Sequence, residues 1–167
     1  NATARGDLFY RLAIREPKPD FRLVAFSAQH ERNDNGEVVK SDPRPLLLHR
    51  GGAEVVEILA FRRDGFDGEI HLSAQFLPLG VTCAGVIIPE GSGRTKLALR
   101  AADNANAWSG NISIVGRARI GDTWVTRMAR SGEVQWGGKQ NESITTSRLA
   151  RNVALAVNDS WRFPFTV

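Results

Sequence analysis

Apolar and polar residues alternate along most of the chain, in the period-two pattern of β-strands that bury one face. The stretch 53–102 shows it most clearly, with three alternating runs separated by turns that contain glycine or proline. The inward positions of these runs are Val56, Ile58 and Ala60, then Ile70, Leu72 and Ala74, then Leu97, Leu99 and Ala101. This pattern predicts an all-β protein in which the strands of 53–102 share one hydrophobic core.

The N-terminal stretch 7–15 also alternates, and its apolar face carries Leu8, Tyr10, Leu12 and Ile14. Pro17 and Pro19 end this strand, because proline has no N–H to donate to a ladder and keeps the preceding residue extended. We therefore expect residues 1–20 to form an arm, the last strand and linker of a preceding domain.

Two hairpins are predicted elsewhere in the chain. A strand begins over 21–27, and the polar insertion that follows contains Asn35-Gly36, a pair that favours a tight hairpin turn. After residue 102, the stretches 111–120 and 123–130 alternate on either side of Gly121-Asp122 and predict the second hairpin.

The C-terminal third has a weaker pattern. Residues 131–147 are rich in Gly, Ser, Thr, Asn and Gln, and predict an edge strand near Val134 followed by a loop. Residues 148–157 predict a final strand, with a helix as the alternative because their alanines suit either state.

The strand predicted over 53–62 has an unusual second face. It holds Val55, Glu57, Leu59 and Phe61, so three of its four positions are apolar, where a solvated sheet face carries mostly polar residues. We expect this face to be covered by the strand 7–15, by the strand 148–157 or by a neighbouring domain.

Five short motifs carry a resemblance to a known family. They are R-R-D-G-F-D-G-E-I-x-L (62–72), L-P-L-G-V-T (77–82), I-P-E-G (88–91), L-A-L-R-A-A (97–102) and V-G-R-A (115–118). Their order and spacing over residues 21–120 resemble an immunoglobulin-like module of large secreted bacterial proteins. Residues 6–21 resemble the last strand and linker of a pre-peptidase C-terminal domain, which often precedes such modules.

The resemblance implies an immunoglobulin-like antiparallel β-sandwich with about 7–9 strands over residues 21–158. Residues 159–167 would then be an exit linker toward a following domain. The family also implies a secreted or cell-surface location and a non-catalytic role. It supplies no catalytic residue and no cofactor.

Glycines in the first motif have a physical role of their own. Gly65 and Gly68 flank Phe66, and glycine reaches the left-handed backbone region without steric cost. We predict that Phe66 folds back and fills the open end of the core. In the second motif, Pro78 and Gly80 predict a turn that carries the chain to the opposing strands.

Charge and composition exclude several partners. The 22 basic and 18 acidic residues give a net charge of +4, and the arginines are scattered from Arg5 to Arg162 rather than clustered, so no nucleic-acid partner is expected. No apolar run approaches the roughly 18 residues that span a bilayer, so no membrane insertion is expected. The one cysteine, Cys83, lies in an apolar run and is predicted to be a small buried residue.

Residues with metal or catalytic chemistry form no recognisable site. Asp64, Asp67 and Glu69 lie within six residues, but calcium loops alternate their oxygen ligands more closely, so a turn is favoured. The histidines His30, His49 and His71 lack the spacing of zinc ligands. No G-x-S-x-G nucleophile motif is present. We therefore predict no metal, no cofactor and no enzymatic activity.

Four tryptophans are present in a chain with only 8% aromatic residues. If Trp108, Trp124 and Trp136 share an exposed face, their rings form a platform on which sugars stack. Packing in the core or against another domain is the alternative for each ring. These three residues are the candidate ligand-binding residues of the chain.

Two functions follow from these observations. The preferred one is a non-catalytic structural or interaction module of a multidomain secreted or cell-surface bacterial protein. Its partners would be neighbouring domains of the same polypeptide, with protein or polysaccharide as further partners. The alternative is a carbohydrate-binding accessory module of an extracellular hydrolase, and exposed tryptophans would favour it.

Overall fold

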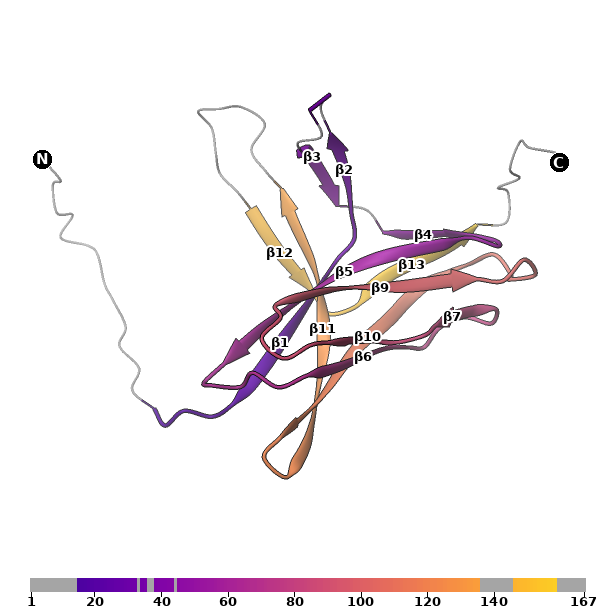
Figure 1. Cartoon of the computed structure of the whole chain (residues 1–167). Coiled ribbons are helices and arrows are strands. Elements are labelled where there is room, and N and C mark those ends of the chain that lie inside the picture. Colours follow the sequence, from indigo (N-terminus) through magenta and orange to yellow (C-terminus); the bar gives the residue numbers. More distant parts are fainter. Residues whose placement is uncertain (1–14, 33, 36–37, 44, 136–145, 159–167) are drawn as a thin grey trace, which may run out of the picture.

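The computed structural model describes residues 15–32, 34–35, 38–43, 45–135 and 146–158. These residues form strands, turns and irregular segments, and none of them lies in a helix (Figure 1). The prediction of an all-β protein is therefore confirmed. The predicted strand 7–15, apart from Arg15, and the predicted exit linker 159–167 lie outside the described residues.

The strands follow one another closely along the chain. They are β1 (Asp20–Phe26), β2 (Ala28–Arg32), β3 (Val38–Pro43), β4 (Leu46–His49), β5 (Ala53–Arg63), β6 (Ile70–Gln75), β7 (Val81–Cys83), β8 (Val86–Ile88), β9 (Arg94–Ala101), β10 (Trp108–Ile120), β11 (Thr123–Gln135), β12 (Thr146–Ala150) and β13 (Val153–Asn158). The described part thus has more strands than the number that the family resemblance implies.

Eleven of the strands belong to one mixed sheet, with the order β4-β13-β10-β11-β1-β5-β9-β7. Strand β12 pairs with β11, β6 pairs with β10, and β8 pairs with β6. The expectation of purely antiparallel pairing is wrong, because β1 runs parallel to β11 and β4 runs parallel to β13. Alternation along a strand shows which face is buried, but it carries no information about the direction of the neighbouring strand.

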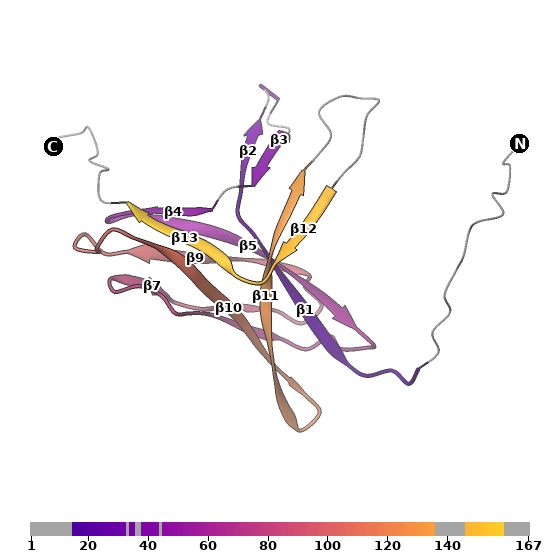
Figure 2. The same ribbon diagram turned by 180° about the vertical axis from the view of Figure 1, so that it is seen from behind.

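The two longest strands, β10 and β11, change partners along their length. The N-terminal part of β10 pairs with β13, and its C-terminal part pairs with both β6 and β11. Strand β11 leaves β10 after Met128 and pairs with β1 from Ala129 onward. These changes fold the sheet back on itself, so that β1, β5 and β9 face β6, β10 and β13 (Figures 1 and 2).

One hydrophobic core fills the space between the facing strands. Its members include Phe21, Leu23, Leu46, Leu48, Val56, Ile58, Ile70, Leu72, Ile88, Leu97, Leu99, Ile112, Ile114, Val153, Leu155 and Val157. The facing strands approach closely at Gly116, where a Cβ atom would lie 2.5 Å from Leu23 Cδ1 and 2.9 Å from Ile70 Cγ2. Strand β10 therefore lies directly against β1 at this point, and a side chain larger than hydrogen requires its neighbours to shift.

The predicted hairpins are both present. Ile120 pairs with Thr123 across the Gly121-Asp122 turn of the β10–β11 hairpin. Strands β2 and β3 form a separate two-stranded sheet that extends beside the ends of β11 and β12 (Figures 1 and 2). Asn35 lies in its turn, and Gly36 is outside the described residues.

The final predicted strand is extended, and the helical alternative is wrong. The structure divides 148–157 at Arg151 and Asn152 into β12 and β13. Strand β12 pairs with β11, whereas β13 pairs with β10 and β4 and buries Val153, Leu155 and Val157 in the core. Strand β13 lies between β10 and β4 and turns its apolar residues toward the core. The alternative that 148–157 covers the second face of β5 is therefore wrong.

Candidate functional site

An open pocket with a volume of about 550 Å³ lies on the outer side of β6, β8 and the β10–β11 hairpin. Its walls come from segments that are far apart in the chain. The lining residues are Gly68, Glu69, His71, Ile87, Pro89, Glu90, Arg119 and Trp124. We call this site the Trp124 pocket.

The strand registers bring these side chains to one face. His71 on β6 lies opposite Arg117 on β10, and Arg119 on β10 lies opposite Trp124 on β11. Arg117 and Arg119 flank the buried Ala118, so they point away from the core. Three neighbouring strands therefore present polar and aromatic side chains on the same outer surface.

Trp124 is the main apolar surface of the pocket. Its side chain is 54% exposed. The Arg117 guanidinium lies 5.2 Å from the centre of the indole ring, and the His71 ring meets the indole edge to face with ring centres 5.8 Å apart. These two contacts position the indole while leaving about half of Trp124 accessible to solvent.

Charged groups of both signs surround the indole. Glu69 Oε1 lies 2.9 Å from His71 Nε2, and Arg119 Nη2 lies 3.4 Å from Asp122 Oδ1. Within the described part of the chain, the Glu90 carboxylate has no ion-pair partner. The pocket thus offers carboxylate acceptors and guanidinium donors side by side, next to an accessible aromatic ring.

The predicted tryptophan platform is not assembled from the residues that the structure describes. Trp108 begins β10, opposite Val157, and packs against the core with its ring beside Gly110. Trp124 lies beside the other end of the same strand, opposite Arg119, so the structure does not bring these two rings together. Trp136, the third candidate, lies outside the described residues.

The three carboxylates considered as calcium ligands have separate partners. Asp64 Oδ2 lies 2.7 Å from Arg15 Nη1 and accepts a hydrogen bond from the Lys18 amide, and these contacts lower the pKa of the Asp64 carboxyl below its ordinary value. Asp67 pairs with Arg62, and Glu69 pairs with His71. Among the described residues, no group of three acidic, histidine or cysteine side chains is placed to hold a metal ion.

The three histidines lie on different strands. His71 lies between the buried Ile70 and Leu72, so it points outward, and it lines the Trp124 pocket. His49 ends β4. His30 lies on β2, and its side chain is outside the described part of the structure.

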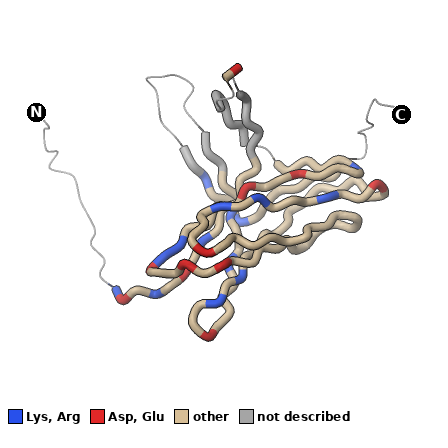
Figure 3. Tube along the Cα trace, viewed as in Figure 1, with Lys and Arg blue, Asp and Glu red and all other residues tan. Residues whose placement is uncertain are grey.

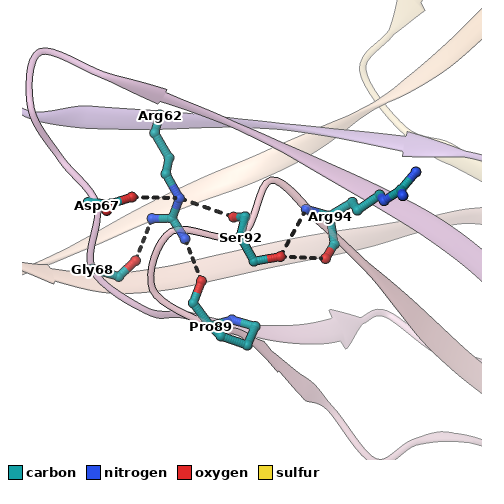
Figure 4. A network of polar contacts seen from close by, with 6 residues as sticks. All are labelled: Arg62, Asp67, Gly68, Pro89, Ser92 and Arg94. Atoms are coloured by element: carbon teal, nitrogen blue, oxygen red, sulfur yellow. Dashed lines mark hydrogen bonds and ion pairs between the residues drawn. The ribbon is translucent and has the colours of Figure 1, made fainter.

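The Arg62 side chain connects the loops at one end of the molecule through hydrogen bonds (Figure 4). Its guanidinium donates to the carbonyl oxygens of Gly68, Pro89 and Ser92, at 2.8 Å for Pro89 and 3.1 Å for Ser92. Its Nε atom lies 3.6 Å from Asp67 Oδ1. Because Gly68 and Pro89 also line the Trp124 pocket, Arg62 holds two of its walls from the core side.

Sequence reasoning identified Trp124 but missed Ile87, Glu90 and Arg119. The signal for Arg119 was its outward position in the alternation of 111–120, and the signal for Glu90 was its place in the I-P-E-G motif. Neither signal shows that these residues lie beside Trp124, because they come from different strands and loops. Only the pairing of β6 with β8 and β10, and of β10 with β11, brings them together.

Basic and acidic residues are interspersed along the described part of the chain (Figure 3). The described residues include no helix that is long and apolar enough to span a membrane.

Comparisons with protein-family models, with curated proteins and with solved structures give no match to this chain.

Proposed function

We propose that this chain is a non-catalytic structural and interaction module of a multidomain secreted or cell-surface bacterial protein. In this proposal, residues 21–158 form an immunoglobulin-like sandwich and residues 1–20 are an arm from a preceding domain. The observation that carries the proposal is an apolar row on the outer face of β5.

The apolar row consists of Val55, Leu59 and Phe61, which lie on the outer face of β5, and the register places the buried Val24 of β1 beside Leu59. Val55 is 48% exposed and Phe61 is 53% exposed. Apolar side chains gathered on an outer sheet face are typical of a contact surface for another segment or domain.

The occupant that fits this row is the alternating segment 7–14 of the same chain. Arg15 and the Lys18 amide both contact Asp64, which directly follows the last residue of β5. Arg15, the first described residue, therefore lies close to the Phe61 end of the row. Eight extended residues span about 26 Å, whereas Phe61 to Val55 covers about 20 Å at ~3.3 Å per residue. The segment is long enough to cover the whole row.

Deleting residues 1–14 and placing a charged residue in the apolar row should have non-additive effects on the free energy of unfolding. In the chain 1–167, Phe61→Asp should lower the free energy of unfolding by about 1–3 kcal/mol, because it places a charge in an apolar contact. In a chain lacking residues 1–14, the same substitution should change the free energy of unfolding by less than about 0.5 kcal/mol. Urea unfolding of the four proteins measures the difference.

Leu47→Asp is a matched control for this experiment. Leu47 is 45% exposed on β4, on a different part of the sheet. Its effect should be small and the same with and without residues 1–14. Equal effects of Phe61→Asp in the long and short chains would show that the segment 7–14 does not cover the apolar row.

The non-catalytic part of the proposal has its own test. The chain should show no turnover of peptide, ester or glycoside substrates above the rate of a heat-denatured sample. Hydrolysis that co-purifies with the folded protein through two chromatographic steps would overturn it.

A further inference from the structure

We propose that the Trp124 pocket binds a neutral saccharide. In this binding mode, the C–H face of a sugar ring packs on the indole of Trp124, and its hydroxyl groups bond to Glu69, Glu90 and Arg119. The site lies on β6, β8, β10 and β11, so it does not rest on the apolar row of β5.

The pocket has an accessible aromatic surface. Trp124 is 54% exposed and Ile87, on another wall, is 45% exposed. Large apolar side chains beside polar ones suit a ligand that has both an apolar face and polar edges. A sugar ring has this character, with C–H groups on its faces and hydroxyl groups around its rim.

The indole of Trp124 is held in position by its neighbours. Arg117 lies over the ring at 5.2 Å, and His71 contacts it edge to face at 5.8 Å. An aromatic side chain that is positioned before binding loses little conformational freedom when the ligand arrives. The two contacts therefore favour stacking of a ligand on the accessible part of the ring.

Charges of both signs surround the pocket. A cationic ligand would approach Arg117 and Arg119, and an anionic ligand would approach Glu69 and Glu90. A neutral ligand meets no like charge. Its hydroxyl groups donate to carboxylates and accept from guanidinium groups, so both kinds of side chain contribute to binding.

The size and openness of the pocket agree with this ligand. Its volume of about 550 Å³ lies within the roughly 300–1,000 Å³ range of small-molecule sites. The pocket is open to solvent on the sheet surface, so the site suits one or two sugar units of a longer chain.

The experiment uses the chain 1–167 and four neutral probes, namely the hexasaccharides of cellulose, xylan, mannan and chitin. Isothermal titration calorimetry and tryptophan fluorescence should detect binding of at least one of them at concentrations up to the millimolar range. An anionic hexagalacturonate and a cationic chitosan hexamer are the charged comparisons, and each should bind more weakly than the best neutral probe.

Variants then locate the site. Trp124→Ala should weaken binding about tenfold or more, since one stacking contact with an aromatic ring is lost. Glu90→Gln should weaken it severalfold, because a charge-assisted hydrogen bond becomes a neutral one. Met128→Ala is the matched control: Met128 lies on the same strand with the same 54% exposure but outside the pocket, so binding should not change.

Three results would overturn the proposal: no binding of any neutral probe at millimolar concentration, equal binding by the wild type and Trp124→Ala, or tighter binding of a charged probe. If Trp124→Ala does not fold, saccharide binding by Trp124→Phe and Glu90→Gln tests the site instead. Deleting residues 1–14 should leave saccharide binding unchanged, so failure of the pocket and failure of the apolar row are distinguished.

Discussion

The Arg62 guanidinium lies over the Phe66 ring, 5.3 Å from its centre. Phe66 is buried, with its ring centre 5.5 Å from that of Phe21. One arginine therefore covers the aromatic ring at the end of the core and also bonds the loops around it. The two side chains connect the core to the walls of the Trp124 pocket.

Replacing Arg62 should destabilise the protein through the loops that it joins. Arg62→Met keeps much of the apolar stem but removes three hydrogen bonds to carbonyl oxygens, each assisted by the charge of the guanidinium. We expect a loss of about 2–4 kcal/mol in the free energy of unfolding, measured by urea denaturation.

Arg94→Met is the control for this substitution. Arg94 lies in the same network through its backbone only, and its guanidinium points away from Arg62 (Figure 4). Its replacement should change stability by less than about 0.5 kcal/mol. Losses of equal size for the two variants would contradict the central role of Arg62.

Truncating Phe66 should also be costly, as expected from the G-F-D-G motif. Phe66→Ala leaves a cavity beside Phe21 and removes the ring under Arg62, so we expect a loss of about 3–5 kcal/mol. Phe66→Leu, which fills more of the space, should lose less. A denaturant midpoint that is unchanged in the alanine variant would mean that the loop is exposed in solution.

A substitution at Gly116 tests how closely β10 packs against β1. Gly116→Ala would bring its Cβ atom within 2.5 Å of Leu23 Cδ1, so side chains must shift, and we expect a loss of about 1–3 kcal/mol. Gly93→Ala is the matched control, because the nearest atom there would be 3.8 Å away. Thermal unfolding of both variants compares them, and a stability loss confined to Gly93→Ala would refute the packing described for β10.

The Asp64 contacts predict a pH dependence with a definite sign. The hydrogen bond from Arg15, together with that from the Lys18 amide, holds the pKa of the Asp64 carboxyl below its ordinary 3.8. Because the pKa is lower in the folded chain, the ionised carboxylate stabilises the folded state above about pH 4. This contribution is lost as the pH falls through the folded pKa.

NMR titration of the Asp64 carboxyl measures this effect directly. Arg15→Gln should raise the Asp64 pKa toward 3.8, while the remaining bond from Lys18 keeps part of the shift. Arg22→Gln, on β1, should leave the Asp64 pKa where it is. A wild-type pKa at or above 3.8 would show that Arg15 does not hold Asp64 in solution.

The sequence by itself determined the class of the fold and the buried face of most strands. Val56, Ile58, Leu97 and Leu99 were predicted to point inward from alternation alone, and all four are buried. The burial of Phe66 was likewise predicted from its flanking glycines. These predictions succeed because the direction of a side chain along a strand depends on local backbone geometry, which repeats every two residues whatever lies beside the strand.

The tertiary structure alone decided which strands are neighbours and which side chains meet in the Trp124 pocket. Alternation is equally compatible with parallel and antiparallel partners, so it did not reveal that β11 leaves β10 and joins β1 at Ala129. Glu90 and Trp124 are brought together in the same way, through ladders between distant segments. The choice of partners depends on packing summed over the whole core, and no short stretch of sequence contains that sum.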